Sequence, residues 1–153
     1  DRADGPLHGS AIPGAFPMSW SDRYVGLPAA RLGRGWQGVD CWGLVELVYR
    51  EELGIALPSY AGAYADPSEV AEVSRLINAA EARGPWVPSH VIRSFDVLTF
   101  GAGRWRSHVG IALDARLMLH VQGHDCAKLE HYRTGRWQHR FRGGFRYVEG
   151  AVQ

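Results

Sequence analysis

The spacing of apolar residues changes once along this chain, near residue 85, and this change restricts the folds that the chain can adopt. Before it, apolar residues recur at helical spacing in two stretches; after it, they alternate in the manner of strands. The alternation predicts strands over residues 95–100, 104–113 and 116–122, with shorter ones near 128–132 and 137–147. Helices followed by strands are typical of an α+β domain, here with N-terminal helices packed on an antiparallel sheet or partial barrel of about five to six strands.

Local signals place the start of each helix. Asp40 is a favourable N-cap, so Cys41 becomes the first residue of an amphipathic helix that ends near Gly54. Asp66, followed by proline and a glutamate at the third helical position, predicts a second helix over residues 66–84. A short helix is expected over residues 19–24, and residues 29–39 are expected to form a glycine-rich loop.

Length and composition favour a single domain. The chain has 153 residues, of which 46% are hydrophobic and 22% charged, enough for one well-packed core. Residues 1–17 are rich in Gly, Pro and Ala and lack either periodicity, which predicts a flexible arm, linker or tag before one domain over residues 18–153. No stretch approaches the roughly 20 apolar residues of a membrane span, and no export signal is recognisable. We therefore expect a soluble protein without a membrane span.

The net charge of +1 is unevenly distributed. Residues 101–147 contain nine Lys or Arg and three Asp or Glu, so the remainder of the chain is acidic. Two interpretations remain open: the basic segment attracts an anionic partner, such as cell-wall polymer or nucleic acid, or it is a solvated arginine-rich edge strand.

Two adjacent predicted strands carry different residues on their two faces. One face is apolar throughout and consists of Val109, Ile111, Leu113, Leu117, Leu119 and Val121. The other face carries His108, Gly110 and Ala112 on one strand and Met118 and His120 on the next. If paired residues satisfy i + j = 228, His108 stands opposite His120 with Cβ atoms about 5 Å apart. Gly110 and Ala112 would then leave room for the helix that begins at Cys41.

This arrangement provides the groups that a thiol nucleophile requires. A helix N-terminus and a neighbouring imidazolium both lower a cysteine pKa, so we expect the pKa of Cys41 to lie below its ordinary value. His108 would act as its base, and His120 would orient that base by accepting a hydrogen bond from its far ring nitrogen. Backbone N–H groups at the helix start would receive an oxyanion.

Other interpretations of the same residues stay open. Cys41 alone is more typical of a small buried hydrophobe, and each histidine alone is more typical of an ordinary core or surface residue. A single disulfide between Cys41 and Cys126 is conceivable. Four soft ligands lie close together in sequence, but their spacing matches no common zinc pattern, so we expect neither a metal nor another cofactor. These ligands are His120, His124, Cys126 and His131.

Four motifs in order resemble the NlpC-type cell-wall cysteine peptidases, a papain-like family, over roughly residues 19–148. Asp40-Cys41-Trp42-Gly43-Leu44-Val45 is similar to the family's nucleophile motif, and Phe95-Asp96-Val97-Leu98-Thr99-Phe100 to the strand that precedes its base. Ser107-His108-Val109-Gly110-Ile111 resembles the base motif, and Met118-Leu119-His120-Val121 the segment with the third polar residue.

The resemblance implies a catalytic set and a substrate. Cys41, His108 and His120 take the roles of nucleophile, base and orienting residue. Such enzymes hydrolyse stem peptides of peptidoglycan, typically on the carboxyl side of γ-linked D-glutamate, without a metal; neither nucleic acid nor a membrane is implied as a partner. The resemblance also points to a substrate-binding set of Tyr24, Asp40, Trp42 and Ser107.

Two departures from the family pattern affect substrate recognition. Ala29 stands where the family usually has a tyrosine, and Trp42 stands where it usually has a serine. A bulky aromatic after the cysteine, together with residues 49–55 and 57–60, looks most like the phage branch of the family. That branch implies a virion tail or tail-like particle, made in the bacterial cytoplasm and acting in the periplasm or cell wall, with other tail-tip proteins as partners.

Three functions compete on these grounds. The first is a tail-associated peptidoglycan endopeptidase that uses Cys41. The second is a catalytically weak or inactive structural tail-tip module with the same fold, as the two departures would allow. The third is an acyltransferase or lipid-processing relative, since acyl-enzyme chemistry is shared across this fold.

Overall fold

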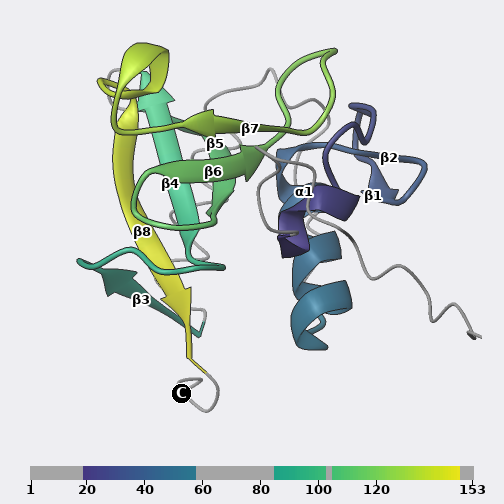
Figure 1. The fold of residues 1–153 in the computed structure, drawn as a ribbon, viewed down its shortest axis with the longest axis horizontal. Coiled ribbons are helices and arrows are strands. Elements are labelled where there is room, and N and C mark those ends of the chain that lie inside the picture. Colours follow the sequence, from purple (N-terminus) through teal and green to yellow (C-terminus); the bar gives the residue numbers. More distant parts are fainter. Residues whose placement is uncertain (1–18, 58–84, 103–104, 149–153) are drawn as a thin grey trace, which may run out of the picture.

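The computed structural model describes residues 19–57, 85–102 and 105–148. Within these ranges it describes all side chains except those of residues 102–107. The predicted arm at residues 1–17 and the predicted helix over residues 66–84 lie outside the described residues. A helical layer and a six-stranded sheet form the domain (Figure 1), which confirms the expected α+β class. None of the helices in the described ranges is long and apolar enough to cross a membrane.

The helical layer is built on the capping signals that the sequence contains. A 3₁₀ turn, η1 (Trp20–Arg23), occupies the predicted short helix. Helix α1 (Cys41–Val48) begins at the predicted residue because Asp40 Oδ1 accepts a hydrogen bond of 2.7 Å from the N–H of Gly43. A π-helical turn, η2 (Tyr49–Leu53), continues it, and Gly54 ends it in the left-handed conformation with φ 66°.

The loop before α1 is more ordered than predicted, because it contains the short antiparallel pair β1 (Arg34–Gly35) and β2 (Gly38–Val39). Arg34 joins this pair to the helix through Asp40 and, at 3.4 Å, through Glu46. Gly43 permits the close approach, since a Cβ at that position would collide with the carbonyl oxygen of Gly33. The start of α1 is therefore held from two sides.

The main sheet is antiparallel throughout, with the strand order β3-β8-β4-β5-β6-β7. Its strands are β3 (Trp86–Ser89), β4 (Val97–Ala102), β5 (Trp105–Ala112), β6 (Leu117–His120), β7 (Lys128–His131) and β8 (Phe141–Tyr147). Strand β3 was not expected from the sequence, because it is short and contains Pro88, which is unfavourable in strands. The other five strands lie where alternation predicts them.

The register between β5 and β6 differs from the prediction. Ile111 pairs with Leu119 and Ala112 with Met118, a shift of two residues from the predicted pairing. The turn accounts for the difference: Asp114 Oδ1 accepts hydrogen bonds from the N–H groups of Arg116 and Leu117, at 2.7 and 2.8 Å, which favours a longer loop. An even shift preserves the faces, so His108 and His120 remain on the same side of the sheet.

Both faces of the sheet are buried. Helix α1 packs through Leu44, Val45 and Val48 on the face that contains Ile111 and Leu119. The opposite face is covered by a second cluster that contains Phe100, Met118, Tyr132 and Trp137. The expectation that α1 approaches the histidine face beside Gly110 is therefore wrong, because the helix buries its apolar stripe on the apolar face. The space beside Gly110 is taken by Met118 and His120.

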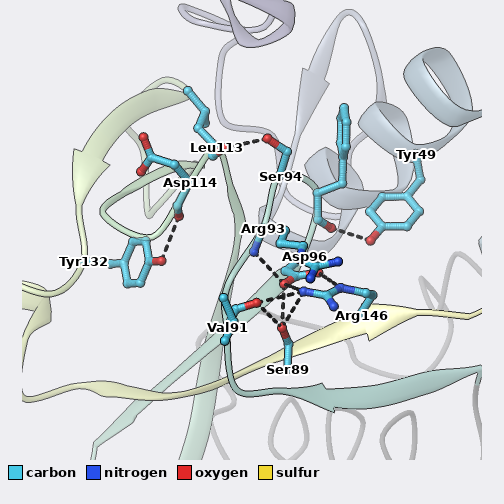
Figure 2. A network of polar contacts seen from close by, with 11 residues as sticks. Tyr49, Ser89, Val91, Arg93, Ser94, Asp96, Leu113, Asp114, Tyr132 and Arg146 are labelled. Carbon is cyan, nitrogen blue, oxygen red and sulfur yellow. Dashed lines mark hydrogen bonds and ion pairs between the residues drawn. The ribbon is translucent and has the colours of Figure 1, made fainter.

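A buried carboxylate joins three strands near the start of β4 (Figure 2). Asp96, only 2% exposed, binds the guanidinium of Arg146 on β8 through both oxygens, at 3.0 and 2.9 Å. It also accepts hydrogen bonds from the hydroxyl of Ser89 at 2.7 Å and from the N–H of Arg93 at 2.9 Å. These donors offset the cost of burying the charge and fix β3 and β8 relative to β4, the neighbour of β5.

Candidate active site

Cys41 is the first residue of α1, and it is half-buried against the apolar cluster between α1 and the sheet. Backbone hydrogen bonds from Val109 on β5 and from Trp42 reach the sulfur. Val109 directly follows His108 in the chain, so the helix start and the histidine strand meet at this point. The structure thus brings Cys41 to the strand on which its predicted base lies.

The pKa of Cys41 is raised to about 12, chiefly by burial and then by the charge of Asp40. Backbone hydrogen bonds and the charge of Arg34 act in the opposite direction but are weaker. The expectation of a lowered thiol pKa is therefore wrong for the resting protein. The N-cap that positions Cys41 also places a carboxylate beside it, and desolvation penalises the thiolate.

His108 lies in β5, is 5% exposed, and packs between aromatic rings. Its imidazole stacks on the indole of Trp137, with ring centroids 5.0 Å apart and an interplanar angle of 21°. Its Nε2 atom lies 2.9 Å from Nδ1 of His120. Burial lowers the pKa of His108 well below its ordinary value, and the charges of His120, Arg140 and Arg136 lower it further. The ring is neutral at neutral pH.

His120, at the end of β6, is fully buried and bonded at both ring nitrogens. Besides the contact with His108, its Nε2 atom lies 2.9 Å from Oε1 of Glu130 on β7. Burial lowers the pKa of His120, and the hydrogen bond and charge of Glu130 oppose this effect. The predicted contact between the two histidines is present, although diagonal rather than directly across the strands.

Glu130 and Trp137 were not recognised from the sequence. Glu130 is held by Arg136, which binds its two oxygens at 2.7 and 2.9 Å. The turn η3 (Gly135–Trp137) brings both Arg136 and Trp137 to the histidines. Extending the face argument by one strand would have found Glu130, which has the same parity on β7 as Met118 and His120 have on β6. No local pattern marks Trp137.

The four predicted substrate-binding residues have different surroundings. Tyr24 is fully buried and donates a hydrogen bond of 2.9 Å to Glu52. Asp40 caps α1 and pairs with Arg34. Trp42 is 8% exposed and packs in the core at an angle to Trp86, with centroids 6.4 Å apart. Ser107 lies on β5 next to His108, and its side chain is outside the described set. Tyr24 and Trp42 thus have packing contacts and Asp40 caps the helix, and their part in substrate binding stays a prediction.

Two alternatives from the sequence are not supported by the geometry. Cys41 and Cys126 are both free thiols. Among the residues that the structure describes, no three His, Cys, Asp or Glu side chains are grouped to hold a metal ion. His120 instead uses both ring nitrogens in contacts with His108 and Glu130.

Comparisons with known proteins agree with this architecture. The NlpC/P60 family model matches residues 29–146. An NLP/P60 protein similar to a lipoprotein from Staphylococcus aureus is 22% identical, with a TM-score of 0.59 over 86% of this chain and 40% of that chain. An NlpC/P60 family protein from Bacillus cereus is 19% identical, with a TM-score of 0.59 over 85% of this chain and 40% of that one.

A third solved structure, the NlpC/P60 domain of the peptidoglycan hydrolase SagA, is 23% identical, with a TM-score of 0.50 over 73% of this chain and 83% of that chain. The chain thus spans about two fifths of the Staphylococcus aureus and Bacillus cereus structures and most of the SagA domain. At these identities the likeness concerns the fold. No curated protein matched the sequence.

Proposed function

Because this chain belongs to the NlpC/P60 family, we propose that it is a cysteine peptidase that hydrolyses the stem peptides of peptidoglycan. The observation that carries the proposal is the meeting of Cys41 with β5 at Val109, one residue from His108, whose far nitrogen is 2.9 Å from His120. A thiol peptidase needs a nucleophile, a base and a residue that orients the base, and Cys41, His108 and His120 are the residues proposed for these roles.

The resting charges favour a general-base mechanism over a preformed ion pair. Since burial keeps both the thiol of Cys41 and the imidazole of His108 neutral, the proton moves to His108 as the sulfur attacks the peptide carbonyl. His108 then returns that proton to the leaving amine as the C–N bond breaks, which leaves an acyl thioester. Water, activated by the same imidazole, hydrolyses the thioester and restores the thiol.

The start of α1 also provides groups for the oxyanion. The N–H groups of Gly43 and Leu44 are used within the cap, by Asp40 Oδ1 at 2.7 Å and by the Asp40 carbonyl at 2.9 Å. Since the backbone of Trp42 bonds to the sulfur, the first-turn group that would bind the oxyanion is the N–H of Cys41. The helix N-terminus adds a favourable partial positive charge at this point.

A digestion of purified muropeptides tests the activity. We expect the wild-type protein to release new amine-terminated fragments, with cleavage on the carboxyl side of γ-linked D-glutamate as the fragment masses would report. Cys41→Ala should abolish release. Cys126→Ala, the matched control at the exposed second thiol, should retain it. Equal product from wild type and Cys41→Ala would contradict the proposal.

We further propose that the domain belongs to a phage or prophage-like tail tip and acts on the wall during penetration or tail assembly. The support is the sequence likeness to the phage branch, including an aromatic residue after the nucleophile. In this setting the partners are peptidoglycan and other tail-tip proteins. Antibody labelling of purified tail particles should locate the domain at the tip, and its absence from such particles would contradict this assignment.

A structural role without catalysis is the second candidate, and the raised thiol pKa favours it. If this function is correct, the wild-type protein should bind tail components yet release no more fragments from muropeptides than Cys41→Ala does. Turnover that depends on Cys41 would exclude it.

A further inference from the structure

The histidine pair is one part of a longer chain of polar contacts that ends on an arginine. From the sheet outward the contacts run from His108 Nε2 to His120 Nδ1, from His120 Nε2 to Glu130 Oε1, and from both Glu130 oxygens to Arg136. The two inner contacts measure 2.9 Å each. We infer that Glu130, anchored by Arg136, is a positioning residue that fixes which nitrogen of each histidine carries the proton. This inference rests on the proposed cysteine peptidase activity.

Glu130 acts in this chain only as an acceptor. Arg136 donates from Nε to Oε2 at 2.7 Å and from Nη2 to Oε1 at 2.9 Å, a two-pronged pairing that favours the ionised carboxylate. The same contacts, with those of His120, lower the pKa of Glu130 to about 2. An ionised carboxylate has no proton to donate, so His120 Nε2 must be the donor in its contact with Oε1.

The remaining protons follow from this one assignment. A neutral imidazole carries one N–H, so a protonated Nε2 leaves Nδ1 of His120 as an acceptor. The atom 2.9 Å from that acceptor is Nε2 of His108, which must therefore donate. Because His108 is also neutral, its Nδ1 atom carries the free lone pair. Nδ1 is the ring nitrogen nearer the backbone, and the sulfur of Cys41 accepts a hydrogen bond from the backbone of the next residue, Val109.

The turn η3 contributes two residues that contact this arrangement. It carries Arg136 on Glu130 and, one residue later, Trp137 stacked on His108 at 5.0 Å. The guanidinium of Arg136 also lies 5.0 Å from the Trp137 ring, and that of Arg140 lies 4.6 Å from it. The charged groups that act on the histidine pair are therefore Glu130, Lys128, Arg136 and Arg140.

Glu130→Gln tests the inference with almost no change in side-chain shape. The amide has both a donor and an acceptor, so it no longer dictates that His120 Nε2 carries the proton. In ¹⁵N-labelled wild-type protein near pH 7.5, NMR should show His108 and His120 protonated at Nε2. In Glu130→Gln a substantial fraction of both rings should be protonated at Nδ1. Nδ1-protonated His108 in the wild type, or unchanged tautomers in the variant, would overturn the inference.

Kinetics provide a second reading of the same variant. Glu130→Gln should lower kcat on muropeptides by about 10- to 100-fold, because a base in the wrong tautomer cannot accept the thiol proton, with KM changed less than about threefold. The charge-matched control is Glu51→Gln, which removes a carboxylate paired with Arg23 and Arg50 and should leave kcat unchanged. An unchanged kcat in Glu130→Gln, with wild-type turnover present, would contradict the positioning role.

If Glu130→Gln does not fold, Arg136→Gln provides a second test. The Arg136 side chain is 52% exposed, so its replacement should leave the fold intact. Its loss should raise the titration midpoint of the Glu130 carboxyl, followed by ¹³C NMR, from about 2 toward the ordinary range. An unmoved midpoint would show that Arg136 is not the anchor. The tautomer measurements need no substrate, so wild-type protein with the expected tautomers but no turnover would refute the proposed peptidase and not the proton assignment.

Discussion

The helix terminus and the other surroundings of Cys41 have opposite effects on the pKa of its thiol. The N-terminal position on α1 favours a thiolate, whereas burial and the carboxylate of Asp40 raise the pKa to about 12. The pKa of His108 changes in the opposite direction, because burial lowers it. In the proposed mechanism both groups are therefore neutral before substrate binds, and the proton leaves the thiol only when substrate is present.

The two neutral histidines predict how stability depends on pH. In the unfolded chain a histidine binds its proton near pH 6.5, while burial keeps folded His108 and His120 neutral below that value. The unfolded state thus binds more protons below pH 6.5, so the free energy of unfolding should fall as the pH is lowered. The slope is about 1.4 kcal/mol per pH unit for each histidine, until its folded pKa is reached.

Urea unfolding between pH 7.5 and 5 measures this dependence. His120→Gln should lose about half of the slope, and His90→Gln, at an exposed position, should retain it. A free energy of unfolding that stays level or rises on acidification through pH 6 would contradict the neutral burial of the pair.

At the level of single residues, the sequence predicts those members of the site that follow from local rules. Cys41 follows from the N-cap at Asp40, and His108 and His120 follow from strand parity. Glu130 and Trp137 enter through the packing of β7 and η3 on the histidine face, which depends on tertiary contacts. Trp42 shows the same limit, because no local pattern in the sequence reveals that its side chain packs in the core.

Among the secondary-structure elements, those defined by strong periodicity or capping are predictable, while their pairing is less so. The start of α1 and its end at Gly54 lie where predicted. The β5–β6 register is not predicted, because the backbone hydrogen bonds of Asp114 select the loop length. The order of the strands also depends on long-range pairing: β8, last in the chain, lies between β3 and β4.

Gly110 on β5 lies against two buried side chains of β6. A Cβ at Gly110 would lie 2.9 Å from Sδ of Met118 and 3.4 Å from Cβ of His120. Because both neighbours are fully buried, Gly110→Ala should reduce the free energy of unfolding by about 1–3 kcal/mol, as overpacking commonly does.

Thermal or urea unfolding of Gly110→Ala checks this value. The matched control is Gly35→Ala on β1, where an added Cβ meets no atom within 4 Å, and it should change the free energy of unfolding by less than about 0.5 kcal/mol. Equal changes in the free energy of unfolding at the two positions would show that Met118 and His120 do not limit the space beside Gly110.

In the molecule as a whole, the segment between η1 and β1 is joined to the loop that precedes the edge strand β7. Gly26 donates to the carbonyl of Ala127 at 2.8 Å, and Ala29 donates to that of Asp125 at 2.9 Å. Two layers, η1–α1 and the six-stranded sheet, are thereby held together near the start of α1 (Figure 1). The position of Cys41 against β5 is consequently a property of the entire domain.

The two thiols of the chain allow a direct test of whether this position creates a nucleophile. Cys126 is exposed and Cys41 is half-buried, so accessibility alone would favour labelling of Cys126. A stem peptide that carries a thiol-reactive electrophile in place of the scissile bond, followed by peptide mapping, reports which sulfur reacts. We predict labelling of Cys41 that is lost in His108→Ala. Labelling confined to Cys126, or labelling of Cys41 that is undiminished in His108→Ala, would contradict the account.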